Sequence, residues 1–144
     1  MCRRCQRKRR RGASAVEMAF IAPVFLTLVL GIIESSRLGM VTQLLTTAAR
    51  EGCRVAVLSG MEQTDVQNRV DAVLTGSGIS VGTVTPTCPA GYSWPDNVPG
   101  GTAITVTLSV PYTSVSWLPV PLFLNGVNIT CSATMSSESP TTGQ

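Results

Sequence analysis

The sequence predicts an α+β protein in which one long N-terminal transmembrane helix leads into a small exported head. An uncharged run of 16 residues extends from Met18 to Ile33, and only 13% of all residues are charged, against a typical ~25%. Later stretches alternate between apolar and polar residues, as half-buried strands do. We therefore expect a second short helix and a three- to four-stranded antiparallel sheet in the head.

Basic side chains are concentrated before Gly12. This segment holds seven of the 11 Lys and Arg residues, whereas residues 12–144 carry four bases and all eight acids, a net charge of −4. Cationic residues beside an apolar helix stay on the cytoplasmic side of a membrane. We expect a basic cytoplasmic leader over 1–12, a transmembrane helix over 13–33 and an exported head over 34–144.

Three interpretations of the leader compete: a secretory signal peptide, an uncleaved anchor, and a leader that is removed on the cytoplasmic side. No small-x-small cleavage site follows Ile33, which argues against the first. The third explains Gly12, which lets a protease approach the backbone, and Glu17, a costly carboxylate at the head of a membrane helix. After cleavage between Gly12 and Ala13, Glu17 would meet the new α-amino group of a neighbouring subunit. Alternatively, Glu17 lies in water near the helix N-terminus, where negative charge is favourable.

A combination of motifs runs through residues 9–60. A basic leader and Gly12 precede Val16-Glu17, an apolar helix with an early Pro23, the turn ESSR, and AAREG at residues 48–52. In this combination the chain resembles the TadE-like family, pseudopilins that assemble tight-adherence (Flp-type) pili. The segment VNITCSATMSSE resembles the closing strand of that family more weakly. The family motif has an aromatic residue after the Glu, where this chain has Met18.

The resemblance implies a pilin-like fold, cleavage between Gly12 and Ala13 by a prepilin peptidase, and a role for Glu17 in processing or assembly. It implies a single-pass protein of the bacterial inner (cytoplasmic) membrane, with the N-terminus in the cytoplasm. Its partners would be other pseudopilins or pilin subunits, the inner-membrane pilus assembly machinery, the peptidase and the lipid bilayer. The alternative is an uncleaved single-pass envelope protein whose exported head binds another envelope component.

The long helix is expected to continue over residues 34–59, because apolar residues recur there at three- and four-residue steps and Gly60 can end it. Pro23 is expected to kink it. Small residues four apart predict a helix-packing face in the membrane, with chance spacing as the alternative; they are Gly31, Ser35 and Gly39. A second row is expected to let the sheet pack close to the helix; it is Ala48, Gly52 and Ala56.

A capping box of Thr64 and Gln67 predicts a second helix that ends at Gly76. Its apolar stripe is expected in the core; it consists of Val66, Val70, Val73 and Leu74. Period-two patterns then predict strands over 104–112 and 127–135, with a weaker one from Ile79 to Val84. Residues 88–101 and 113–126 read as loops. The second loop is expected to form an apolar lid on the core, and the alternative is a patch for membrane or partner; it contains Trp117, Leu118, Val120, Leu122, Phe123 and Leu124.

The five cysteines and the absence of histidine limit the reactions and metal sites that this chain can support. In an oxidising compartment a disulfide between Cys88 and Cys131 is the preferred pairing, although spacing does not prove it, and Cys53 suits a buried helix position. The absence of His excludes Ser-His-Asp triads and His-ligated metals, and Cys2-x-x-Cys5 has no second pair. We expect no metal, no cofactor and no enzymatic activity; scattered carboxylates argue against a membrane-anchored hydrolase. The basic cluster adjoins the membrane segment, so we assign it to topology rather than nucleic-acid binding.

Overall fold

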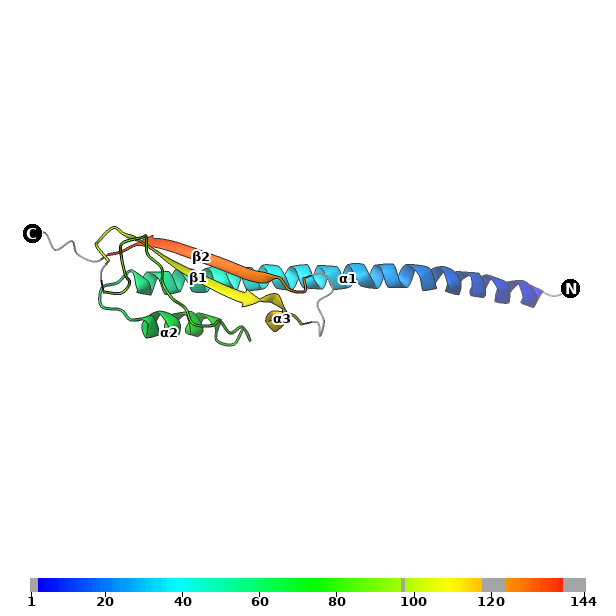
Figure 1. The fold of residues 1–144 in the computed structure, drawn as a ribbon. Helices are drawn as coiled ribbons and strands as arrows, with labels where there is room; N and C mark the ends of the chain where they lie inside the picture. Colours follow the sequence, from blue (N-terminus) through cyan, green and yellow to red (C-terminus); the bar gives the residue numbers. More distant parts are fainter. Residues whose placement is uncertain (1–2, 97, 118–123, 139–144) are drawn as a thin grey trace, which may run out of the picture.

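One long helix, α1 (Arg3–Ala56), forms the axis of the molecule, and the other elements pack against its C-terminal half (Figure 1). The computed structural model describes residues 3–96, 98–117 and 124–138. After α1 come α2 (Gln63–Leu74), β1 (Ala103–Pro111), the short α3 (Tyr112–Val115) and β2 (Asn128–Ser136). The α+β class, the long apolar helix and the second short helix are therefore confirmed.

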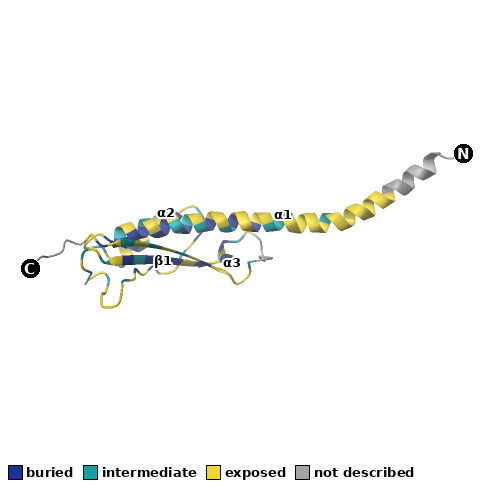
Figure 2. Ribbon diagram, turned by 90° about the horizontal axis from the view of Figure 1, so that it is seen from above, coloured by how far each residue is buried: buried dark blue, intermediate teal, exposed yellow. Residues whose placement is uncertain are grey.

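The helix α1 has two different halves. From Gly12 to Leu28 nearly all of its residues are exposed, whereas one face of its C-terminal half is buried beneath the head (Figure 2). Buried positions such as Val41, Leu45, Ala49 and Cys53 recur every four residues, which is the spacing of one helix face. The continuation beyond the apolar run is thus present, although α1 ends at Ala56, three residues earlier than predicted.

Pro23 and Gly60 were predicted to kink and to end α1, respectively. The helix runs through Pro23 without ending, and the Thr27 hydroxyl donates to the Pro23 carbonyl at 2.8 Å. Figure 2 shows α1 curving along its N-terminal part. Beyond Ala56 the chain turns at Gly60, whose φ of +79° is in the left-handed region that glycine adopts without strain.

The helix α2 begins earlier than its sequence suggests. Glu62, not Thr64, occupies the N-cap, and the Asp65 carboxylate accepts a hydrogen bond from the Glu62 backbone N–H at 2.9 Å. Gln67 instead accepts from the Val84 N–H at 2.9 Å and so ties the following loop to α2. The predicted cap was wrong because Glu and Asp can form the same reciprocal box two residues upstream. The apolar stripe of α2 is buried as expected, through Val66, Val70 and Leu74.

The described residues form a two-stranded sheet rather than the three to four strands predicted. β1 and β2 are antiparallel and pair from Ala103 opposite Ser136 to Pro111 opposite Asn128. The third strand expected near residues 79–84 is absent; instead, Thr87 forms one bridge with Thr105, with N–H to carbonyl distances of 2.8 Å in both directions. Pro86 and Pro89 flank this bridge, and proline cannot donate to a ladder, so pairing stops there.

The core lies between the C-terminal half of α1, helix α2 and the inner face of the sheet. Along β1 the buried side chains alternate with exposed ones, and the buried set is Ile104, Val106, Leu108 and Val110. At Gly52 on α1, an added Cβ would lie 2.7 Å from Val70 Cγ2 of α2 and 3.7 Å from Val106 Cγ1 of β1. This position therefore allows the predicted close approach, and the tightest contact is to α2.

Candidate functional site: the membrane helix and its junction with the head

Between Val16 and Ile33, α1 presents exposed apolar side chains to its surroundings. Phe20, Val24 and Leu28 are 77%, 70% and 58% exposed. Among the described residues, one helix is long and apolar enough to cross a membrane, at Gly12–Ala56, and no part of its most apolar window is buried inside the protein. A helix that is apolar all round needs a hydrocarbon environment, which the head does not provide. The segment is consistent with a single-pass membrane protein.

The residues assigned to processing lie on this free part of α1. Gly12, Ala13 and Glu17 are all exposed and all helical. The head begins to bury α1 only at Glu34, which is seventeen residues after Glu17 and about 26 Å along the axis at 1.5 Å per residue. The structure therefore leaves these three positions open to other molecules.

The predicted helix-packing face extends from the membrane segment to the edge of the head. The Ser35 hydroxyl donates to the Gly31 carbonyl at 2.9 Å, so it is satisfied within its own helix. Gly39 is exposed, and a Cβ added there would meet nothing within 4 Å. Gly31 is half-buried and lines an open groove of ≈ 510 Å³ together with Leu124 of the head. Packing of this face against another chain stays a prediction.

Two charged residues are buried where α1 enters the head. Glu34 is 2% exposed and Arg37 is 7% exposed, although charged side chains are rarely buried this far without partners. The Arg37 Nε donates to the Val115 carbonyl at 2.8 Å, and the Tyr112 hydroxyl donates to the Glu34 backbone carbonyl at 3.1 Å. Burial, and then the Glu34 charge, raise the pKa of the Tyr112 hydroxyl. These contacts attach the end of β1 and α3 to α1.

The same arginine also contacts an exposed tryptophan. The Arg37 Cζ lies 4.9 Å from the centre of the Trp117 ring, within the range of a cation–π contact, and Trp117 is 68% exposed. The predicted lid is thus not formed at this residue, whereas Leu124 is half-buried against the core. The other apolar residues of that loop, 118–123, lie outside the described residues. Sequence reasoning quoted the ESSR turn only as a motif and missed that Arg37 would meet Trp117.

The predicted Cys88–Cys131 disulfide is not formed. Cys88 follows the residue that pairs with β1 at Thr105, whereas Cys131 pairs with Leu108 from the opposite side of β1. Across the sheet, the two cysteines are two strand spacings of about 4.8 Å apart, and along the strands they are roughly 10–13 Å apart. A disulfide requires the two Cα atoms to lie within about 7 Å. Both thiols are free, as is that of Cys53. The alternation of apolar and polar residues predicted which face of the sheet Cys131 occupies. It did not predict which segment of the chain lies beside β2.

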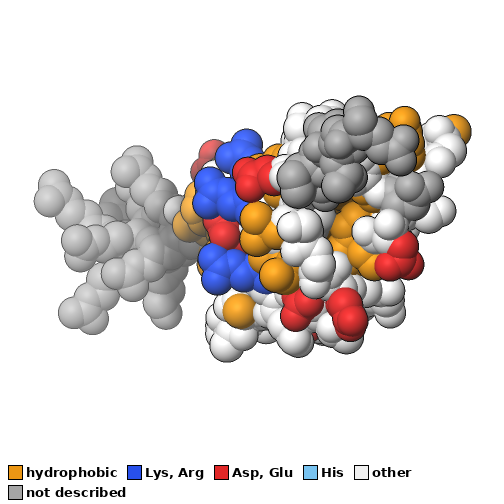
Figure 3. Space-filling view, turned by 90° about the vertical axis from the view of Figure 1, so that its left-hand side faces the viewer, with side chains coloured by type: hydrophobic (Ala, Val, Ile, Leu, Met, Phe, Trp, Pro, Cys, Tyr) orange, Lys and Arg blue, Asp and Glu red, His pale blue; other side chains and the backbone are white. Residues whose placement is uncertain are grey.

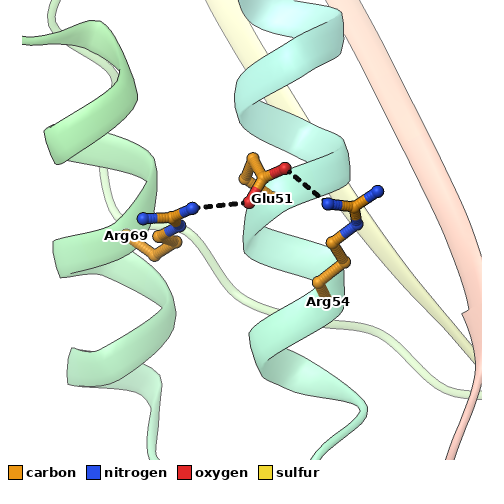
Figure 4. A network of polar contacts seen from close by, with 3 residues as sticks. All are labelled: Glu51, Arg54 and Arg69. Atoms are coloured by element: carbon orange, nitrogen blue, oxygen red, sulfur yellow. Dashed lines mark hydrogen bonds and ion pairs between the residues drawn. The ribbon is translucent and has the colours of Figure 1, made fainter.

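The far end of the head carries a network of charges between α1 and α2. Figure 3 views the molecule from this end and shows acidic and basic side chains side by side. Glu51 accepts from Arg69 at 2.7 Å and from Arg54 at 2.9 Å (Figure 4). The hydrogen bond from Arg69 lowers the pKa of the Glu51 carboxyl. Because these side chains are largely in water, the network adds little stability and serves to align the two helices.

Comparison with known proteins finds a family similarity over most of α1. The model of the TadE-like protein family matches residues 12–54. No curated protein and no solved structure gives a match. The matched residues include Gly12, Glu17, the buried Glu34 and Arg37, and the close-packed Gly52. Together with the exposed apolar helix, the match fits a pseudopilin-like membrane protein of tight-adherence pili, a structural class rather than an enzyme class. The predicted resemblance to the TadE-like family is thus confirmed over residues 12–54.

Proposed function

We propose that this protein is a non-enzymatic pseudopilin that acts in assembly of a tight-adherence (Flp-type) pilus or a related secretion filament. The observation that carries the proposal is the coincidence of the TadE-like segment, residues 12–54, with a helix that carries an exposed apolar run between Val16 and Ile33. In the proposal, residues 13–33 cross the inner membrane, the basic leader remains in the cytoplasm and the head is exported. The head then meets other pilus components outside the membrane.

The mechanism is subunit packing in two environments. At the outer end of the span and just beyond it, the row Gly31, Ser35 and Gly39 lets a second helix approach closely, and two of these residues carry no side chain. Glu17 pairs with the α-amino group that cleavage creates on a neighbouring subunit, because a charge pair is favoured over a lone carboxylate in lipid. The partners are other pseudopilins or pilin subunits and the inner-membrane assembly machinery.

Processing is proposed between Gly12 and Ala13 by a prepilin peptidase. Both residues lie within α1, so the helix must open locally before its backbone fits a protease. Glycine lowers the cost of this opening, since it is about 1 kcal/mol less favourable than alanine in a helix. The exposed position of both residues, far from the head, supports access by an enzyme in the membrane.

The intact mass of the protein purified from a host with its prepilin peptidase tests this proposal. We expect a mature chain that begins at Ala13 and lacks the twelve leader residues.

Gly12→Val should retain the leader, because a branched side chain blocks approach to the bond, whereas the matched Gly39→Val should be processed normally. Glu17→Ala should insert in the membrane and yet fail in processing or pilus assembly. A wild-type chain that keeps its leader would instead favour the uncleaved envelope protein, and unchanged piliation with Glu17→Ala would contradict the role of that carboxylate.

A further inference from the structure

The head exposes one tryptophan at the end that faces the apolar half of α1. Trp117 is 68% exposed, although Tyr112 and Val115 just before it are 1% and 3% exposed. Figures 1 and 2 both place α3, which precedes Trp117, beside α1 where that helix leaves the head. An exposed indole next to an apolar helix is the arrangement that membrane interfaces favour, because the ring is apolar and its N–H is polar.

Two hydrogen bonds and one ring contact hold Trp117 at a defined level of α1. The Arg37 Nε donates to the Val115 carbonyl at 2.8 Å, and the Tyr112 hydroxyl donates to the Glu34 carbonyl at 3.1 Å. The Arg37 guanidinium lies 4.9 Å from the centre of the Trp117 ring. Tyr112 and Val115, the first and last residues of α3, are both hydrogen-bonded to α1. The Trp117 indole therefore cannot move far along the axis of α1 without breaking these contacts.

That level coincides with the headgroup layer of a bilayer. Arg37 is four residues beyond Ile33, the last residue of the apolar run, which is about 6 Å along the helix. Headgroups add roughly 5–7 Å to each side of a hydrocarbon core of about 30 Å. Helical side chains also tilt toward the N-terminus of their helix, which brings the Arg37 guanidinium closer to the hydrocarbon.

A groove extends from the membrane segment to the head. This open groove of ≈ 510 Å³ is lined by Leu28, Gly31 and Ile32 of the apolar run, by Glu34, Ser35, Ser36 and Leu38 of the next turns of α1, and by Leu124 of the head. Ile32 is 58% exposed at its edge. The apolar part of this groove lies inside the proposed span, where exposure to water would be unfavourable, and its polar part begins at Glu34, where the head begins.

We propose that Trp117 is an interfacial anchor that seats the head on the phospholipid surface of the outer leaflet, with Arg37 as its positioning residue. The proposal rests on the proposed membrane span over residues 13–33 and adds to it a second, lateral attachment. Its occupant is the lipid surface, because the exposed Trp117 is held against Arg37 on α1 immediately beyond the apolar run that ends at Ile33. The anchor would keep the head at a fixed height, from which neighbouring subunits meet in register.

Fluorescence quenching by brominated lipids tests this anchor, and the chain supplies its own control. The sequence has two tryptophans, and the second, Trp94, donates to the Ala56 carbonyl at 2.9 Å, about 35 Å beyond Ile33 along α1. The full chain is reconstituted into phosphatidylcholine–phosphatidylglycerol vesicles that carry bromine near the glycerol end of the acyl chains. Trp94→Phe leaves only Trp117 to emit, and Trp117→Phe leaves only Trp94.

The expected result is that Trp117 loses most of its emission in brominated vesicles, while Trp94 emits as in unbrominated ones. Full emission from Trp117 in chains that float with the vesicles would overturn the anchor and leave the membrane span standing. If such a Trp117 is also shielded from aqueous acrylamide, another copy of the chain covers it, and the lipid occupant is again excluded. Chains that do not float with vesicles would overturn both the anchor and the proposed span.

Discussion

Cys53 shows how a single residue joins α1 to the sheet. Its side chain is completely buried, and its thiol donates to the Ile104 carbonyl of β1 at 3.4 Å. Burial raises the pKa of the Cys53 thiol. A buried, protonated thiol is inert toward oxidants and alkylating reagents, because the thiolate is the reactive form. Cys53 therefore acts as a small apolar residue with one weak hydrogen bond.

We predict that Cys53 reacts with a maleimide only when the head unfolds. In the folded protein at pH 8, Cys88 and Cys131 should be labelled first, since both are partly exposed. The raised pKa of the Cys53 thiol means that its thiolate forms only at a higher pH than usual. Mildly alkaline buffer should therefore not remove the difference in labelling rate between Cys53 and the other two cysteines. Mass spectrometry of labelled peptides against denaturant concentration measures it. Labelling of Cys53 as fast as Cys131 in native buffer would contradict the burial of Cys53. The control is Cys53→Ala, in which the slowly labelled cysteine is missing.

At the scale of elements, the packing of α1 against α2 depends on the missing side chain of Gly52. The two helices approach closely there, and Val66 and Val70 of α2 fill the space that a Cβ would take. The Glu51–Arg69 ion pair lies next to this contact and aligns the same two helices at the surface. Close approach increases the dispersion contacts between the helices, so the geometry tolerates no larger residue.

We predict that Gly52→Ala lowers the free energy of unfolding of the head by about 1–3 kcal/mol, the usual cost of overpacking. The reason is the 2.7 Å separation between the new Cβ and Val70 Cγ2, which forces α2 to shift. Chemical denaturation in detergent, followed by circular dichroism, measures the change. The matched control is Gly39→Ala on the exposed face of α1, which should be neutral or slightly stabilising because alanine favours the helix. Equal stability of the two variants would refute the close contact.

At the scale of the whole molecule, one continuous helix links two environments. Its apolar run between Val16 and Ile33 suits lipid, and its C-terminal half is the central element of a folded head, with the buried Glu34 and Arg37 at the boundary. The head in turn holds its own core among α1, α2 and the sheet, so changes in the exposed half of α1 should not reach it.

We predict that Leu26→Arg impairs membrane insertion and leaves the fold of the head unchanged. Leu26 is 58% exposed near the middle of the apolar run, where an arginine costs about 2.5–3.5 kcal/mol. Carbonate extraction of membranes measures insertion, and thermal melting in detergent measures the head. Leu58→Arg is the matched control, because Leu58 is 44% exposed but lies beyond the end of α1. Full membrane retention of Leu26→Arg would argue against the span over 13–33.

The outline of the fold could be predicted because it depends on local patterns. Strand alternation identified β1 and β2 nearly to the residue, and four-residue steps identified the extension of α1 into the head. The third strand, predicted over residues 79–84, was wrong because that segment does not pair; only Thr87 reaches β1, and Pro86 and Pro89 beside it limit the contact to one bridge. The α2 cap failed by two residues because several acidic and polar residues there can form similar boxes.

The sequence by itself determined the apolar run, the basic N-terminal segment and the TadE-like resemblance over residues 12–54, because each is a property of neighbouring residues along one helix. Only the tertiary structure decided that Cys88 and Cys131 lie apart, that Gly52 faces Val70, and that Arg37 meets Trp117. These contacts join residues distant in the chain, and their geometry depends on strand register and helix packing, which hydrophobic period alone does not encode.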